Sequence, residues 1–159
     1  MAKVCRHYQR RSPRSLYTQR IFTRIKAIAD TGLLVALARE NDQYHDWAVE
    51  VAEQISWPVL TCEAVLAETA FHLQSSRDVL GMLRDNIVRL AFDCESEIEQ
   101  LYYLAERYAD RSPDLADLCL IRMSELFPRH SIITVDSDFK VYRRNKREAI
   151  SLLCPPGKR

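Results

Sequence analysis

The chain has 159 residues, of which 47% are hydrophobic and 28% charged, a balance typical of one globular domain with a conventional core. No apolar run approaches the roughly 20 residues that a membrane-spanning helix requires, which argues against a membrane protein. The net charge of +1 hides an asymmetry, because residues 1–26 carry eight basic residues and no acid. We therefore expect a basic, flexible extension at residues 1–24, one acidic domain at 25–156 and a short tail at 157–159.

The five cysteines are odd in number, include no C-x-x-C pair and lie mostly in apolar surroundings. This pattern predicts buried, reduced thiols in a cytosolic protein and argues against a disulfide framework or a zinc site. The four histidines also lack any zinc-binding spacing. A metal site in this chain would therefore depend on carboxylates.

Short apolar segments alternate along the chain with longer segments that favour helix. Strands are expected at residues 25–30, 57–60, 90–92, 132–135 and 150–153. Helices are expected from residue 31, over 44–55, from 61 to 74, from 75 or 76 to 90, over 97–109, and from 112–113, where a proline can begin a helix. This alternation predicts an α/β domain with a mostly parallel sheet.

Four acidic residues lie inside or directly after apolar segments, where an unpaired carboxylate is costly to bury. They are Asp30, Glu68, Asp117 and Asp136. Asp30 and Asp136 each follow a predicted strand, and ligands of open parallel sheets bind beyond the carboxyl ends of the strands. We therefore expect the four carboxylates to converge on one site, most simply one that binds a divalent cation.

Four sequence stretches carry a family resemblance when taken together and in order. They are Ala29–Leu37, Thr61–Glu68, Asp114–Asp117 and Thr134–Phe139, the last with a T-x-D-x-D-F pattern. In this order and spacing the chain resembles the PIN-domain nucleases, the fold of VapC-type toxins, from about residue 26 to 156. The resemblance implies a three-layer α/β/α sandwich and an endoribonuclease that depends on Mg²⁺ or Mn²⁺.

Carried over by position, the resemblance implies which residues form the site. The catalytic and metal-binding carboxylates would be Asp30, Glu68, Asp117 and Asp136, with Asp138 as a further candidate metal ligand, and Thr134 would support the site. The family also implies an RNA substrate, a cognate antitoxin, a homodimer and a cytoplasmic location. The extension at residues 1–24 departs from the family, whose members usually begin at their first strand.

Each acidic position also has a simpler interpretation. Asp30 could cap the helix that follows it, and Glu68 could be a surface residue paired with His72 one turn later. Asp138 could cap the turn into Phe139 as readily as it could join the site. Asp117 could complement the dipole of its helix, although Asp114 is better placed to do so.

Two other features are open to more than one interpretation. His45 and Trp47 could line a substrate groove, although packing of Trp47 into the core is the simpler expectation. The basic run at residues 143–147 could be a solvated face or could hold RNA phosphates.

Other functions fit less well. Asp30-Thr31-Gly32 matches the D-T-G of aspartic proteases, but those enzymes need an all-β body rich in glycine, and this chain has three glycines. Asp136-Ser137-Asp138 matches a phosphatase D-x-D pair, which usually follows the first strand rather than a late one. The strongest alternative is a PIN-like module that binds RNA or a protein without cleaving it.

Overall fold

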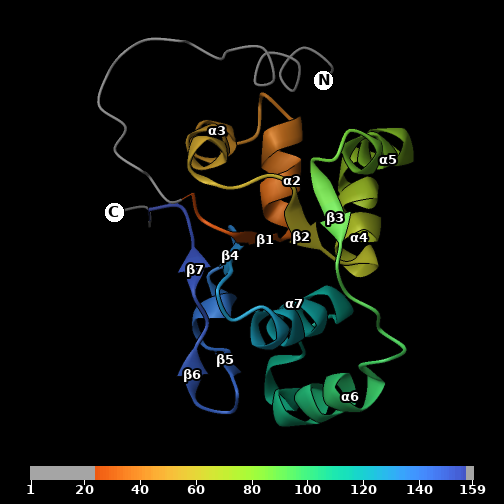
Figure 1. The fold of residues 1–159 in the computed structure, drawn as a ribbon, viewed down its shortest axis with the longest axis vertical. Helices are drawn as coiled ribbons and strands as arrows, with labels where there is room; N and C mark the ends of the chain where they lie inside the picture. The colour runs from red at the N-terminus through yellow and green to blue at the C-terminus, as the bar shows by residue number, and fades with distance from the viewer. Residues whose placement is uncertain (1–23, 157–159) are drawn as a thin grey trace.

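The computed structural model describes residues 24–156, whose centre is a five-stranded sheet (Figure 1). The sheet consists of β1 (Ala27–Ala29), β2 (Val59–Thr61), β3 (Val88–Leu90), β4 (Ser131–Ile133) and β7 (Leu152–Leu153), in the order β3-β2-β1-β4-β7. All neighbouring strands in it are parallel. A separate antiparallel hairpin, β5 (Arg143–Arg144) and β6 (Glu148–Ala149), was not expected from the sequence.

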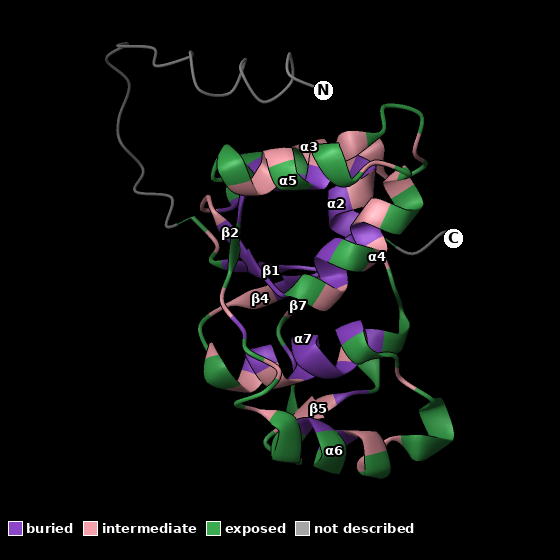
Figure 2. Cartoon of the chain, turned by 90° about the vertical axis from the view of Figure 1, so that its right-hand side faces the viewer, coloured by how far each residue is buried: buried purple, intermediate pink, exposed green. Residues whose placement is uncertain are grey.

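Helices cover both faces of the sheet. They are α2 (Thr31–Ala38), α3 (His45–Gln54), α4 (Glu63–Leu73), α5 (Ser76–Arg84), α6 (Ile98–Arg107) and α7 (Leu115–Leu126), with 3-10 turns η1 (Ala109–Arg111) and η2 (Asp138–Lys140). Figure 2 shows α2, α3, α4 and α5 on one side of the sheet and α7 on the other, with α6 beyond it. This arrangement confirms the three-layer α/β/α sandwich.

The central strands are apolar because helices exclude water from both of their faces. β1 and β2 are buried along their whole lengths. Ile28 lies in register with Leu60 on one side and with Ile132 on the other. The continuous apolar segments of the central strands are therefore explained by helices that cover both faces of the sheet there.

The strand order changes direction at β1, which pairs with β2 on one side and with β4 on the other. The chain leaves β1 at Asp30, whose backbone N–H donates a 3.1 Å hydrogen bond to the carbonyl of Ile133 at the end of β4. Segments that are a hundred residues apart in the sequence thus end side by side. This is the edge at which open parallel sheets bind ligands.

The helix expected from residue 75 to 90 is wrong beyond Arg84. Ser75 caps α5 as expected, its hydroxyl accepting from the Asp78 N–H. The helix ends at Arg84, and Asn86 then adopts a left-handed φ of 54° that a helix cannot continue through. The strand expected at 90–92 consequently lies earlier, at Val88–Leu90.

Smaller shifts affect other element ends. The expected strand at 57–60 is observed at Val59–Thr61, and Cys62 rather than Thr61 precedes α4. The Thr61 hydroxyl donates instead to the Ala29 carbonyl at 3.2 Å, which links β2 to β1. The helix expected from residues 112–113 begins at Leu115 because Ser112 is left-handed, with a φ of 48°, and Asp114 supplies the cap.

The expected basic extension and tail lie outside the described residues, apart from Arg24. Within residues 24–156, no helix combines the length and apolar composition needed to cross a bilayer.

Candidate active site

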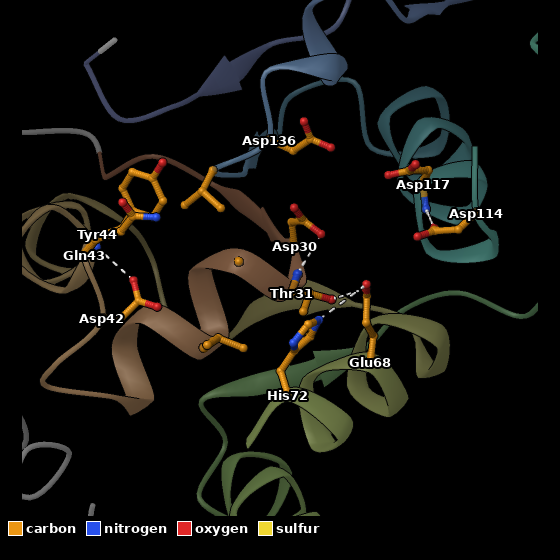
Figure 3. Close-up of a pocket in the computed structure, with 13 residues that line it drawn as sticks. Asp30, Thr31, Asp42, Gln43, Tyr44, Glu68, His72, Asp114, Asp117 and Asp136 are labelled. Carbon is orange, nitrogen blue, oxygen red and sulfur yellow. Dashed lines mark hydrogen bonds and ion pairs between the residues drawn. The ribbon is translucent and has the colours of Figure 1, made fainter. Parts of the chain in front are cut away.

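A pocket of about 360 Å³ opens beyond the carboxyl ends of β1 and β4. Its lining contains the carboxylates of Asp30, Asp42, Glu68, Asp114, Asp117 and Asp136. Figure 3 shows Asp30 and Asp136 from the sheet edge, Glu68 from α4, and Asp114 and Asp117 from the start of α7 around one opening. The fold therefore brings together the four carboxylates that the sequence singled out.

Asp30 is the most buried of these acids, with 9% of its surface exposed. Its Oδ1 accepts a 2.7 Å hydrogen bond from the Thr31 N–H, and its Oδ2 accepts a 2.6 Å bond from the Thr134 hydroxyl. Burial raises the pKa of Asp30 to about 6, although both hydrogen bonds lower it. The charges of Glu68 and Asp136 raise the pKa further. Asp30 is thus a helix cap, as the simpler interpretation held, and also part of the pocket.

Glu68 is held towards Asp30 by Thr31. The Thr31 hydroxyl donates a 2.6 Å hydrogen bond to Glu68 Oε2. His72, one turn further along α4, places its Nε2 4.0 Å from Glu68 Oε1. Glu68 thus contacts His72, as the simpler interpretation held, and also lines the pocket. Glu63, at the start of the same helix, is exposed and does not line it.

Asp117 lies in the first turn of α7 and is partly buried. Its backbone N–H donates a 2.8 Å hydrogen bond to Asp114 Oδ1, so Asp114 is the residue that caps the helix. Burial raises the pKa of Asp117 to about 7, and the charges of Asp114, Asp30 and Asp136 add to the effect. Helix capping by Asp114 leaves the Asp117 carboxylate free to face the pocket.

Asp136 follows β4 and is exposed at the rim of the pocket. Its backbone N–H donates a 2.9 Å hydrogen bond to the Thr134 hydroxyl. Its Oδ1 accepts a 2.8 Å hydrogen bond from the Asp138 backbone N–H. Asp138 does not line the pocket; its observed contact is this backbone bond at the start of η2.

The pocket carries negative charge without a matching cation in its lining. No lysine or arginine is among the described residues that line it, and His72 is the one basic side chain there. The field extends to the buried Tyr142, whose pKa rises to about 12 through burial and then through the charges of Asp117, Asp138, Asp136 and Asp114. A bound cation would offset this accumulated charge.

The donor set fits a hard divalent cation, because every candidate ligand is a carboxylate oxygen. Across residues 24–156, however, no three His, Cys, Asp or Glu side chains are yet close enough together to hold an ion. Mutual repulsion between carboxylates favours such separation. Glu68, Asp117 and Asp136 are each partly or fully exposed, which leaves them room to rotate towards a common point.

Sequence reasoning missed several residues that line the pocket. Asp42, Gln43 and Tyr44 enter from the segment between α2 and α3, and Asp114 was considered only for its effect on the helix dipole. His45 and Trp47, proposed for a groove, are absent from the lining; Trp47 is partly buried against the core. The Thr31 hydroxyl could have been noticed because it directly follows Asp30.

A family model described as the PIN domain matches residues 27–145 of the chain. The chain belongs to the PIN domain family. Comparison with curated proteins gives no significant match. Among solved structures, this PIN domain is similar to Mycobacterium tuberculosis VapC20, described as a sarcin-ricin loop cleaving toxin. The two share 18% sequence identity with a TM-score of 0.64, over 71% of this chain and 92% of that one.

At this identity the VapC20 match supports the fold, and the family model independently supports membership. The matched range includes all four pocket carboxylates singled out from the sequence and Asp138. The roles of these side chains in this PIN domain follow from its own geometry and are proposed below.

Proposed function

We propose that this chain is a divalent-metal-dependent endoribonuclease that hydrolyses RNA phosphodiester bonds, and that it is the toxin of a type II toxin–antitoxin pair. One observation carries the proposal. Asp30, Glu68, Asp117 and Asp136, from four separate segments, line one pocket at the switch point of the sheet. Burial and mutual repulsion raise the pKa values of Asp30 and Asp117, so the ionised cluster favours a cation.

We assign Asp30 and Asp136 as the principal ligands of a Mg²⁺ or Mn²⁺ ion, with Glu68 and Asp117 acting directly or through water. Such an ion neutralises charge on the phosphate and lowers the pKa of bound water. Thr134 fixes the Asp30 carboxylate, and Thr31 fixes Glu68. Asp117 lines the pocket from the first turn of α7 and is the candidate group to orient the attacking water.

RNA needs positive surface as well, and the β5–β6 hairpin is the candidate. Lys146 and Arg147 are exposed there, whereas Arg144 is paired with Glu148 at 3.1 Å. The segment before the hairpin begins at the pocket, since Asp136 lines the pocket and lies seven residues before Arg143. The expected phosphate-binding role of the basic run therefore rests on Lys146 and Arg147.

A toxin of this kind would act in the cytoplasm, as a homodimer restrained by its antitoxin. The early apolar segments at Leu33–Leu37 and Val65–Leu73 are the sequence-based candidates for the dimer interface, and most of their residues are not exposed. Leu33, Leu34, Val65 and Leu66 are buried in the core. Phe71, at the end of α4, is 79% exposed and Leu80 of α5 is 63% exposed. These two helices pack against each other and offer the better dimerisation face.

The test is incubation of the purified chain with RNA and Mn²⁺, comparing the wild type with Asp30→Asn and Asp117→Asn. Both variants keep side-chain shape and remove a charge. We expect cleavage by the wild type, loss of at least about 100-fold in either variant, and suppression by a chelator. The matched control is Glu63→Gln, which removes a carboxylate from α4 outside the pocket and should cleave normally.

Cleavage that survives both Asp30→Asn and Asp117→Asn would place the active site elsewhere. If no RNA is cleaved and metal leaves the melting temperature unchanged, the chain is better described as a binding module. Toxin function has its own test, since expression should arrest growth for the wild type but not for Asp30→Asn. An antitoxin should relieve that arrest.

A further inference from the structure

Three cysteines from separate parts of the sequence meet beside α7. Cys62 precedes α4, Cys94 lies in the segment between β3 and α6, and Cys119 lies in α7. Cys94 Sγ is 3.5 Å from Cys119 Sγ, and the neighbouring Cys62 thiol raises the pKa of Cys119. Cys62 and Cys119 are fully buried, whereas Cys94 is partly exposed. Solvent therefore reaches this group of thiols through Cys94.

A second contact, three residues further along both partners, holds the segment between β3 and α6 against α7. Arg122 Nε donates a 2.7 Å hydrogen bond to Glu97 Oε2, and both side chains are about one-fifth exposed. Glu97 follows Cys94 by three residues, and Arg122 follows Cys119 by three residues. The segment thus runs along one face of α7 with two cross-contacts. The short distance between the Cys94 and Cys119 sulfurs therefore depends on how the backbone of this segment lies along α7, and not on a side-chain rotamer alone.

We propose that Cys94 and Cys119 form a reversible disulfide that fastens the segment before α6 to α7. The co-reactant is a low-molecular-weight disulfide. The Cys94 thiolate attacks it and releases one thiol, which leaves Cys94 in a mixed disulfide. Cys119 then loses its proton and attacks the Cys94 sulfur, releasing the second thiol. Two protein thiols are oxidised, and one small disulfide is reduced to two thiols.

Bond formation requires the two sulfurs to approach from 3.5 Å to about 2 Å. The link spans 25 residues of sequence, from 94 to 119, and encloses all of α6. Cross-linking a loop of this size restricts the unfolded chain and stabilises the folded one. Cys119 lies in α7, which contains Asp117 and is capped by Asp114, so the redox state would set the stability of one wall of the pocket. This inference is independent of RNA cleavage.

The experiment equilibrates the folded, full-length chain in buffers of increasing oxidised-to-reduced glutathione ratio, followed by acid quenching and alkylation of free thiols. Trypsin separates the cysteines, because Cys62 falls in residues 40–77, Cys94 in 90–107 and Cys119 in 112–122. We expect the 90–107 and 112–122 peptides to become linked. The linked protein should melt roughly 5 to 10 °C higher, and reduction should reverse the change.

Cys94→Ser should abolish both the link and the rise in melting temperature; this partly exposed position tolerates a small polar side chain. The matched control is Cys154→Ser, which removes a partly exposed cysteine outside the cluster and should change neither. A dominant link between 40–77 and 112–122 would assign the disulfide to Cys62 instead. The proposal is also overturned if the 90–107 link forms only in denaturant, or if the linked protein melts no higher than the reduced one.

Discussion

Thr134 and Asp30, 104 residues apart in the sequence, are joined by a 2.6 Å hydrogen bond at the base of the acidic pocket. The Thr134 hydroxyl donates to Asp30 Oδ2 and accepts from the Asp136 backbone N–H at 2.9 Å. One fully buried side chain therefore positions both residues that we assign as principal metal ligands. The bond also lowers the pKa of Asp30 against the larger effect of burial.

Replacing Thr134 by Val keeps the branched shape and removes this hydroxyl. We expect the pKa of Asp30 to rise above its present value of about 6, because the bond that stabilises the ionised form is lost. Metal affinity should fall about 10- to 100-fold, as is usual when a supporting group of a ligand is removed. Carbon-detected NMR titration of the carboxyl groups and metal titration measure the two effects. Thr134→Ser should restore both, and wild-type values in Thr134→Val would contradict the assigned role.

The metal-free chain should lose stability as pH rises from about 4 to 7. The pKa of Asp30 is raised from its ordinary value of 3.8 to about 6 in the folded chain, so the folded state binds more protons in this range. Its contribution to the free energy of unfolding is full below pH 4 and is lost as pH passes 6, by at most about 3 kcal/mol. Asp117 acts in the same direction, with a pKa of about 7.

Urea unfolding with a chelator at pH 5 and pH 7.5 measures this effect. Asp30→Asn cannot titrate and should show a smaller decrease in the free energy of unfolding between the two pH values. It should also be more stable than the wild type at pH 7.5, since no charge is buried. An equal pH dependence in both proteins would show that Asp30 is not the group responsible.

Divalent metal should reverse this loss of stability. An ion bound by the pocket acids stabilises the folded chain by about 2.7 kcal/mol at a concentration 100 times its dissociation constant. We expect Mn²⁺ to raise the melting temperature of the wild type at pH 7.5, with little change in Asp30→Asn or Asp136→Asn. The Glu63→Gln control should respond as the wild type does. A similar rise in all four proteins would indicate binding outside the pocket.

The roles of Asp136 and Asp138 in RNA cleavage can be distinguished by replacing each aspartate with asparagine. Asp136 lines the pocket, whereas the observed contact of Asp138 is its backbone N–H bonded to Asp136 Oδ1, and this bond does not need its carboxylate. We expect Asp138→Asn to reduce RNA cleavage by less than tenfold and Asp136→Asn by a hundredfold or more. Equal losses in single-turnover cleavage would restore Asp138 to the set of metal ligands.

Gly32 is required where α2 begins beside the end of β4. A Cβ built at Gly32 would lie 2.3 Å from Val135 Cγ2, which forces Val135 or the helix to move. Gly32→Ala should therefore lower the free energy of unfolding by about 1–3 kcal/mol and weaken metal binding, because Val135 precedes Asp136. Denaturant titration and metal titration measure both changes.

Gly81 is the matched control, since no atom lies within 4 Å of a Cβ built there in α5. Gly81→Ala should raise the free energy of unfolding by about 0.5–1 kcal/mol through helix propensity and leave metal binding unchanged. If both alanine variants were equally stable, close packing at Gly32 would not be the reason for its glycine.

The sequence predicted a mostly parallel sheet. Segments such as Ile25–Ala29 and Ile132–Val135 do not alternate regularly between apolar and polar residues, as expected for strands that helices cover on both faces. The sequence was less reliable at element ends. The end of α5 depends on the left-handed Asn86, and the start of α7 depends on Asp114 and Ser112. Such local choices are decided by the contacts that each turn makes after folding, which helix propensity does not report.

By itself, the sequence determined the candidate acids and the edge of the sheet where they gather, because burial of a carboxylate after a strand is unusual and parallel strands end together. Only the tertiary structure decided how these acids are held. The Thr134–Asp30 bond, the Thr31–Glu68 bond and the entry of Asp42 and Asp114 into the pocket join residues from distant segments. Distances between such segments depend on how the layers pack, and packing is a property of the folded chain.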